Sequence, residues 1–377
     1  MPLRKIVYII GELGAGGAER QLHLLLRCLD RTKVEPLLVV WNLDPSQELH
    51  PHYFNLDIRI LSISRRGGRL GRLISFLALM WKERPDYIHS IGFHTNFAAW
   101  LAHWIPGIKG SLGGFQSDYF HEVKKTGRIV GKLCARYPKT AISNSSATIR
   151  TIESLKTLWK PKNIYHFENS VEAKYFDAFQ RLERTSASSN PVVQLVGVGR
   201  LNGEKRWENF VEVLSKFKIR HPEISWHCRI LGEGVTRPII EARIKELKME
   251  KDVELVGFVD NVEEGLRQGD IFVFYSEFEG SPNVVSEAMA VGLPVISTPA
   301  GDLPDVIRNG QNGYLADDPN EYIRILAKLC KDSELRRRLG AAGRETMYQS
   351  RSAETLWDRL ASIYDRVGWL PRVGTSP

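Results

Sequence analysis

The stretch that decides the fold is residues 276–296, SEFEGSPNVVSEAMAVGLPVI. It follows an apolar run at 271–275, turns at 280–282, and continues into a helical pattern that ends at Gly292 before a second apolar run. A strand, a glycine turn, a helix and another strand in this order are typical of a parallel α/β sheet. We therefore expect an α/β fold here, with the turn as a candidate ligand site.

Two glutamates of this stretch are candidate ligand contacts. Glu279 lies in the loop before the predicted helix, and Glu287 lies more than one turn inside it. Both carboxylates could accept hydrogen bonds from sugar or ribose hydroxyls, while the helix N-terminal amides around 282–284 favour phosphate oxygens. By themselves two such carboxylates also fit the acid and base of a glycoside hydrolase. In a third interpretation Glu287 only caps the helix or forms an ion pair, which would require a buried partner.

Short apolar runs alternate with longer amphipathic segments on both sides of this stretch. This alternation predicts parallel sheets covered by helices, in two Rossmann-like, doubly wound halves. The expected strands are Lys5–Ile10, Glu35–Trp41, Tyr87–Ser90, Val192–Gly197, Trp226–Leu231, Val253–Leu255, Asp270–Tyr275 and Pro294–Ser297. The expected helices begin near Ala18 and Thr95 or span Trp207–Arg220 and Arg237–Lys248.

The length of 377 residues exceeds that of one compact domain. Residues 181–191, RLERTSASSNP, lack apolar periodicity and read as a linker. We therefore predict an N-terminal domain over 1–172 and a C-terminal domain over 192–352. The apolar side of 353–370 predicts a last helix within 353–377 that packs back across the domains.

The composition excludes several classes of protein. Hydrophobic residues make up 43% and charged residues 25%, which is ordinary for a folded globular chain. The four cysteines are scattered without a CxxC pair, which argues against a zinc site and fits the cytoplasm. The first apolar run is too short for a signal peptide, and no run is long enough to cross a bilayer. The net charge of +8 predicts an anionic partner, but no nucleic-acid motif accompanies it.

One amphipathic segment has two interpretations. Residues 65–84, RRGGRLGRLISFLALMWKER, place basic residues around an apolar, tryptophan-containing centre. We favour a helix whose apolar side faces the core, since most amphipathic helices do so. A helix that lies in a membrane interface is the alternative.

The first predicted strand leads into a glycine-rich loop, residues 11–20, GELGAGGAER. Its glycines let backbone amides approach a ligand at a helix N-terminus, a place that favours anions. A dinucleotide site is a weaker interpretation, because no acidic residue stands clearly at the end of the second strand. A tight turn without a ligand is another.

A pair of cations follows the first strand of the second half. Arg200 and Lys205 stand in GRLNGEK, residues 199–205, at the expected carboxyl edge of a sheet, where α/β folds bind ligands. Arginine can grip two phosphate oxygens and lysine supplies a mobile point charge, so the pair suits a diphosphate leaving group. A solvated basic loop is the alternative.

Together these motifs resemble glycosyltransferase family 4 and its GT-B relatives. Glu279 and Glu287 stand in an E-x7-E arrangement within FEGSPNVVSEAMAVGLPVIST, which looks like that family's signature. Further pieces occur in the family's order: GGAER (16–20), PDYIHS (85–90), FENSVE (167–172), GRLNGEK (199–205), LVGFVDN (255–261) and GDLPDVIRNGQNGYLA (301–316). The resemblance covers nearly the whole chain.

The resemblance implies a GT-B fold, with two Rossmann-like domains facing across a cleft, and a retaining hexosyltransferase. Arg200 and Lys205 would bind the donor diphosphate, Glu287 the ribose, and Glu279 the transferred sugar. No metal or other cofactor is expected, because cationic side chains replace a divalent ion. The remaining implied donor contacts are Gly16, Gly17, Gly257, Phe258, Val259, Gly280, Ser281, Pro282, Asn283 and Val284.

The chain departs from the family at one position. Many members carry a histidine in a loop of the first domain that reaches the donor sugar, whereas residues 110–121 read GSLGGFQSDYFH. Gln116, Asp118 and His94 are the candidate replacements for sugar or acceptor contact, and His89 is a further candidate. An enzyme that works without such a contact is the alternative.

The implied reaction transfers a hexose-type sugar from a nucleotide diphosphate sugar to a hydroxyl of a lipid-linked or cell-surface glycan. The enzyme would be cytoplasmic or peripheral on the inner face of the cell membrane, and an anionic membrane surface is a candidate partner. A non-catalytic sugar-nucleotide-binding protein and a sugar-nucleotide epimerase stay open as alternatives. The donor base, the sugar and the acceptor are not determined by the sequence.

Overall fold

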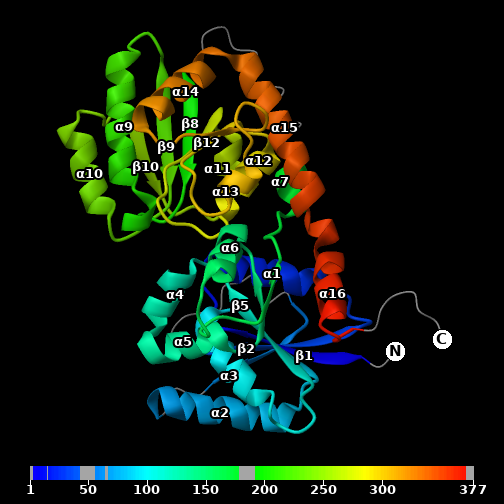
Figure 1. The fold of residues 1–377 in the computed structure, drawn as a ribbon. Helices are drawn as coiled ribbons and strands as arrows, with labels where there is room; N and C mark the ends of the chain where they lie inside the picture. The colour runs from blue at the N-terminus through cyan, green and yellow to red at the C-terminus, as the bar shows by residue number, and fades with distance from the viewer. Residues whose placement is uncertain (1–2, 15, 43–55, 64–66, 178–191, 371–377) are drawn as a thin grey trace. The chain divides into compact units, whose positions relative to one another are not determined.

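The computed structural model describes residues 3–14, 16–42, 56–63, 67–177 and 192–370 (Figure 1). Contacts divide the chain into two units, Met1–Ser170 with Ala353–Pro377, and Val171–Ser352. The predicted linker 181–191 lies outside the described residues.

The first unit contains a parallel sheet in which the strand order is β3-β2-β1-β4-β5-β6-β7. The chain begins in the middle of this sheet, builds outward through β2 and β3, and then continues on the other side of β1 from β4 onward. Its strands are β1 (Arg4–Ile10), β2 (Val34–Val40), β3 (Arg59–Ser62), β4 (Tyr87–Ser90), β5 (Gly110–Phe115), β6 (Thr140–Ser143) and β7 (Asn163–His166). The order reverses between β1 and β4, which is where doubly wound sheets bind ligands.

Helices cover both faces of this sheet, and β1 shows why. Ile6, Tyr8 and Ile10 pack in one apolar cluster, whereas Val7 and Ile9 pack in another on the opposite face. A strand that is buried on both faces is apolar throughout. The helical segments are α1 (Gly17–Cys28), α2 (Gly68–Glu83), η2 (Phe93–Thr95), α3 (Asn96–Ala102), α4 (Tyr119–Thr126), α5 (Arg128–Arg136), α6 (Ser146–Ser154), η4 (Ala353–Thr355) and α16 (Leu356–Arg366).

The C-terminal helix α16 belongs to the first unit. Leu360 and Tyr364 are fully buried in the same cluster as the leucines of α1, and the Tyr364 hydroxyl donates to the Tyr8 hydroxyl at 3.1 Å. We predicted that this helix would pack across the domains; within the described structure its apolar side completes the core of the first unit.

The second unit is also doubly wound, with the strand order β10-β9-β8-β11-β12-β13. Its strands are β8 (Val193–Val198), β9 (Trp226–Leu231), β10 (Val253–Gly257), β11 (Ile271–Phe274), β12 (Val295–Ser297) and β13 (Tyr314–Leu315). Its helical segments are α7 (Ala173–Asp177), η3 (Gly203–Lys205), α9 (Trp207–Arg220), α10 (Arg237–Glu246), α11 (Val262–Arg267), α12 (Asn283–Val291), α13 (Leu303–Val306), α14 (Pro319–Lys331) and α15 (Ser333–Arg351).

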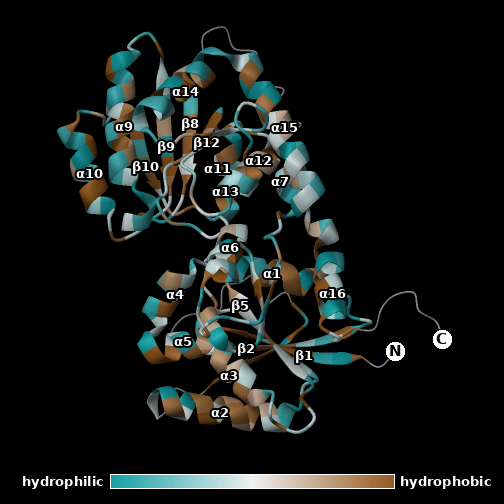
Figure 2. Cartoon of the chain, viewed as in Figure 1, coloured by the Kyte–Doolittle hydropathy of each residue, from teal (hydrophilic) through white to brown (hydrophobic). Residues whose placement is uncertain are grey.

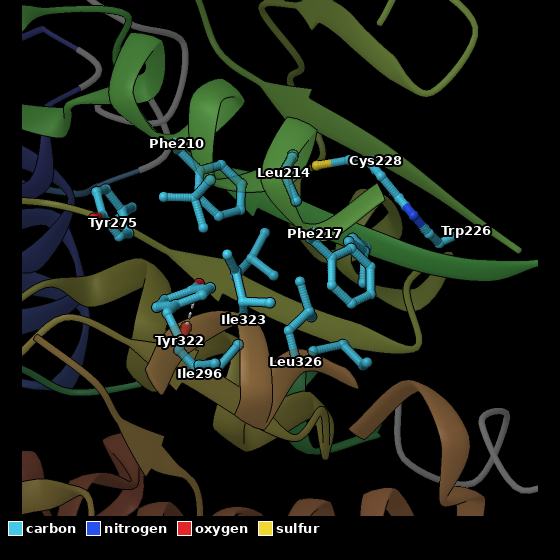
Figure 3. Close-up of a cluster of buried hydrophobic side chains, with 14 of the residues drawn as sticks. Phe210, Leu214, Phe217, Trp226, Cys228, Tyr275, Ile296, Tyr322, Ile323 and Leu326 are labelled. Carbon is cyan, nitrogen blue, oxygen red and sulfur yellow. Dashed lines mark hydrogen bonds between the residues drawn. The ribbon is translucent and has the colours of Figure 1, made fainter. Parts of the chain in front are cut away.

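One core of the second unit combines aromatic and aliphatic side chains (Figure 3). Phe210 and Phe217 of α9 and Tyr322 of α14 are fully buried against the sheet. The Tyr322 hydroxyl donates to the Ile296 carbonyl at 3.2 Å, so its only polar atom is satisfied. This core fixes β8, β11 and β12, the strands from which the candidate site loops leave.

Most of the predicted strands and helices are present in the structure, and for some of them both the first and the last residue agree. The strands 87–90 and 226–231 and the helix 207–220 have the expected bounds. The helix of the deciding stretch ends where expected, because Gly292 adopts the left-handed conformation (φ 96°) that closes a helix. One boundary differs: we predicted a first domain to residue 172, but Val171 donates its N–H to the Arg351 carbonyl at 2.8 Å within the second unit.

In the described part of the chain, no helix combines the length and apolarity that spanning a bilayer requires.

Candidate active site

The candidate site of the second unit lies where the strand order reverses. Strands β8 and β11 are neighbours in the sheet. After β8 the chain continues to β9 on one side of this pair, and after β11 it continues to β12 on the other side. The loops that follow their carboxyl ends therefore meet. The Glu204 carbonyl accepts hydrogen bonds from the Ser276 hydroxyl (3.1 Å) and from the Glu277 N–H (3.0 Å). This arrangement brings the predicted cations and the first predicted glutamate to one place.

Lys205 and Glu279 form an ion pair at this junction. The Lys205 ammonium donates to Glu279 Oε1, and the two side chains are only 15% and 12% exposed. The same ammonium lies 5.0 Å from the centre of the Phe274 ring, so the Glu279 carboxylate and this ring both attract it. We predicted that Lys205 would contact phosphate and Glu279 the sugar; the structure joins them directly, which fixes both charges relative to each other.

Arg200 differs from Lys205 in its surroundings. Its side chain is exposed, and no described residue forms a hydrogen bond or ion pair with its guanidinium. A second cation that we did not predict, Arg206, lies 5.4 Å over the Tyr275 ring and has a left-handed backbone (φ 51°). Arg200 is therefore the cation of this loop that can bind an anion without breaking a contact among the described residues.

The turn before α12 packs against the segment that follows β12 and accepts a hydrogen bond from it. Gly301 has a left-handed backbone (φ 61°), and a Cβ there would lie 2.4 Å from the Gly280 carbonyl oxygen. The N–H of Asp302 donates to that same carbonyl at 3.0 Å. Any side chain at position 301 would displace the turn, so glycine is required there for both reasons.

A buried arginine holds the other side of this turn. The guanidinium of Arg351 is 2% exposed and donates to Ser281 Oγ (3.2 Å), Ser286 Oγ (2.9 Å) and Asp302 Oδ2 (2.8 Å). Its backbone carbonyl accepts the Val171 N–H, beside the point where the chain passes to the first unit. The sequence gives no sign of this role for Arg351, because a lone arginine at the end of a charged helix normally faces solvent.

The second glutamate of the deciding stretch lies where we expected it. Glu287 is in the second turn of α12 and only 4% exposed, among apolar neighbours that are fully buried. Pro282 occupies the N-cap position, and Asn283 and Val284 begin the helix. A buried carboxylate needs hydrogen-bond partners. The predicted roles of Glu287 toward ribose and of 280–284 toward phosphate stay predictions.

Gly257 is the last residue of β10, and residues 258–259 follow it at the same edge of the sheet, two strands from β8. Gly257 has a left-handed backbone (φ 91°), and its carbonyl accepts the Gly232 N–H at 2.8 Å. Phe258 is 61% exposed, so its ring is open to a ligand. That Gly257, Phe258 and Val259 border a nucleotide base stays a prediction.

In the first unit, His94 packs against the glycine loop at the corresponding reversal point. It follows β4, while Gly11 follows β1, and a Cβ on Gly11 would lie 2.4 Å from His94 Cε1. Part of the ring remains exposed, yet the surrounding protein and the charge of Lys125 lower the pKa of His94. The lowered pKa favours the neutral imidazole. Gly16 and Gly17, at the start of α1, complete this loop.

The other candidates of the first unit have different surroundings. Gln116 lines a pocket together with Asn144 and other uncharged residues, and Asn144 Oδ1 is buried there with no hydrogen-bond partner among the described residues. Asp118 is the N-cap of α4, where its carboxylate accepts the His121 N–H at 2.9 Å, which explains this residue without a sugar. His89 is buried and hydrogen-bonded to the Tyr364 hydroxyl at 2.8 Å, and burial lowers its pKa to about 3.

Among the described residues, no group of three or more histidine, cysteine, aspartate or glutamate side chains is arranged to hold a metal ion.

Comparison with known proteins gives a family match for part of the chain. Residues 180–346 match the family described as glycosyl transferases group 1. The match lies within the second unit and covers less than half of the chain. The N-acetyl-alpha-D-glucosaminyl L-malate synthase of Bacillus anthracis is 30% identical over 60% of the chain, and the match spans 58% of that relative's length. The lipopolysaccharide core biosynthesis glycosyltransferase LpsE of Rhizobium meliloti is 23% identical over 92% of the chain and 95% of its own length.

Solved structures show the same fold for nearly the whole chain. HepE of Anabaena, crystallised with UDP and glucose, covers 96% of this chain and 99% of its own, with a TM-score of 0.78 and 16% identity. At this identity the likeness concerns the fold alone. The expected GT-B fold class, with two parallel-sheet α/β units, is thereby confirmed for this chain.

Proposed function

We propose that this glycosyltransferase moves a hexose-type sugar, with retention of configuration, from a nucleotide diphosphate sugar to a hydroxyl of a glycan acceptor. The observation that carries the proposal is the junction of the β8 and β11 loops. An exposed cation, Arg200, lies there in the same loop as a fixed ion pair, Lys205 with Glu279. Such a place suits a ligand that is anionic at one end and hydroxylated at the other.

In the proposed mechanism Arg200 and Lys205 neutralise the charge that develops on the leaving diphosphate. Glu279, already paired with Lys205, orients the sugar and stabilises positive charge at the reacting carbon without bonding to it covalently. The acceptor hydroxyl attacks from the side on which the diphosphate departs, and a diphosphate oxygen takes its proton. Because side chains supply the positive charge, we propose that no divalent metal is needed.

The names of the relatives support a donor and an acceptor class. HepE was crystallised with UDP and glucose, and LpsE acts in lipopolysaccharide core biosynthesis. We therefore propose a UDP-sugar as the first donor to test and a lipid-linked or cell-surface glycan as acceptor. The uncharged pocket that contains Gln116 and Asn144 suits the hydroxyls of a neutral sugar.

A thermal-shift panel of UDP-, GDP- and ADP-sugars tests the donor assignment. A ligand at 100 times its Kd stabilises the folded protein by about 2.7 kcal/mol, so one nucleotide class should raise the melting temperature well above the others. The panel is run in EDTA, so that the same shift also tests binding without a metal. If no sugar nucleotide shifts the transition, the proposed function is wrong; donor turnover without any acceptor would favour an epimerase.

We expect Gly11→Ala to lower transfer by displacing His94. The added Cβ would lie 2.4 and 2.7 Å from ring atoms of His94, so the imidazole must move away. If His94 contacts the sugar or the acceptor, such a displacement costs about tenfold to a hundredfold in kcat. The measurement is the initial rate of transfer, together with the melting temperature.

Gly14→Ala is the matched control, because a Cβ on Gly14 meets no atom of the described residues within 4 Å, its chain neighbours aside. It lies in the same loop and should change the rate far less. In a His94→Ala background, Gly11→Ala should have no further effect, since the side chain that it displaces is gone. Additive losses in the double variant would show that Gly11 acts independently of His94.

A further inference from the structure

The strongest feature that the proposed function leaves unused is the outer surface of α2. Three large apolar side chains on this helix are exposed: Leu70 at 68%, Ile74 at 59% and Trp81 at 54%. They are separated by four and seven residues, which places them on one side of the helix. Ala78, also exposed, lies between them on that side. We call these four residues the α2 stripe.

The α2 stripe is distinct from the side of the helix that serves the core. Phe76 and Met80 are fully buried in a cluster with Val7 and Ile9 of β1, and Leu73 and Leu77 pack against the same cluster. The core therefore uses one apolar side and leaves the stripe uncovered by the described residues. Figure 2 shows hydrophobic colouring along most of the visible side of α2. A soluble domain does not need this second apolar side for its own folding.

Basic residues accompany the α2 stripe, and the acidic residue of the helix is turned away from it. Arg69 and Lys82 are exposed at the two ends of α2, and the guanidinium of Arg84 lies 5.5 Å over the Trp81 ring. Glu83, whose side chain is 8% exposed, forms ion pairs with Lys5 (2.8 Å) and Arg59 (2.9 Å). The outward side of α2 therefore combines apolar and positive groups without a carboxylate.

We propose that the α2 stripe is a membrane-docking surface that binds an anionic phospholipid bilayer. Leucine and isoleucine side chains can enter the acyl boundary, tryptophan prefers the headgroup level, and flanking basic residues attract anionic lipids. An apolar protein partner would explain the stripe but not the positive charge at both of its ends. The sixteen residues of α2 lie on the bilayer rather than cross it. This proposal does not rest on the transfer reaction.

Vesicle flotation of the full chain tests the proposal. The wild type should float with vesicles of phosphatidylcholine and phosphatidylglycerol, should stay at the bottom with phosphatidylcholine alone, and should be released by salt. The variant Leu70→Ala/Ile74→Ala/Trp81→Ala should reduce the floated fraction at least about tenfold. Arg69→Glu/Lys82→Glu should reduce it to a similar extent, because each basic residue near the surface contributes about 1 kcal/mol.

The control removes three exposed apolar side chains of the second unit, Ile219→Ala/Val235→Ala/Ile239→Ala, which are 76%, 88% and 51% exposed. Its flotation should equal that of the wild type, and melting temperatures should show that every variant is folded. Absence of wild-type flotation, or equal flotation of the stripe variant, would overturn the proposal. Light scattering that shows a wild-type dimer and a monomeric stripe variant, without flotation, would assign the stripe to a second copy instead.

Discussion

Lys205→Ala is expected to lower kcat for sugar transfer by about 100- to 1,000-fold. The substitution removes the ammonium that would stabilise the leaving diphosphate, an electrostatic contribution of this size in other enzymes. It also leaves Glu279, which is 12% exposed, without its ion-pair partner. A stopped assay of product formation at saturating donor measures kcat, and the same series at varied donor gives KM.

Arg200→Ala distinguishes the loss of a charge at the diphosphate from the loss of the ion pair with Glu279. No described residue forms a hydrogen bond or ion pair with its guanidinium, so a loss of turnover in this variant reflects a contact with the ligand. Lys216→Ala is the matched control, because Lys216 is an exposed lysine on α9 of the same unit. Transfer at nearly the wild-type rate in both Lys205→Ala and Arg200→Ala would remove these residues from the proposed mechanism.

Arg351→Met is expected to destabilise the second unit by about 3–5 kcal/mol. Removing one partner of a buried ion pair leaves the other charge without compensation, and Asp302 is only 1% exposed. The hydroxyls of Ser281 in the turn and of Ser286 in α12 lose the same donor. Urea denaturation followed by circular dichroism measures the loss, and Ser350→Ala, one residue away, should show almost none.

A second variant distinguishes stability from loop geometry. Arg351→Met/Asp302→Leu removes both charges, and such replacements often restore stability. Because Ser281 and Ser286 lack the guanidinium in both variants, we expect KM for the donor to be raised above the wild-type value in the double variant, although the protein is folded. A double variant that recovers both stability and KM would show that Arg351 supports folding only. Failure to recover stability would show that Arg351 contributes more than charge compensation.

The parts of the candidate site that lie close together along the chain could be predicted from the sequence. Glu279 and Glu287 lie in one strand, turn and helix, and apolar runs with a closing glycine indicate such elements directly. Arg200 and Lys205 follow a predicted strand within a few residues. Asp118 is a residue whose role its local sequence did not determine. It is a candidate sugar contact, but in the structure its carboxylate accepts the N–H of the residue three positions later, as in an ordinary helix cap.

The contacts that complete the site were not predictable from one sequence. Arg351 binds side chains 49 to 70 positions away, and Lys205 is paired with a residue 74 positions away. The pairing of Lys205 with Glu279 depends on β8 and β11 being neighbours. The packing of His94 on Gly11 likewise requires that β1 and β4 be adjacent. Periodicity predicts a strand but does not state which strand lies beside it.

The amino-acid sequence by itself determined the α/β class, most of the elements around the deciding stretch and the residue types of the candidate donor site. The tertiary structure alone decided which charges meet and which are buried. It also decided that Phe76 and Met80 of α2 serve the core while Leu70, Ile74 and Trp81 remain exposed. The physical reason is that local propensity depends on neighbours along the chain, whereas burial and ion pairing depend on the order in which distant strands assemble.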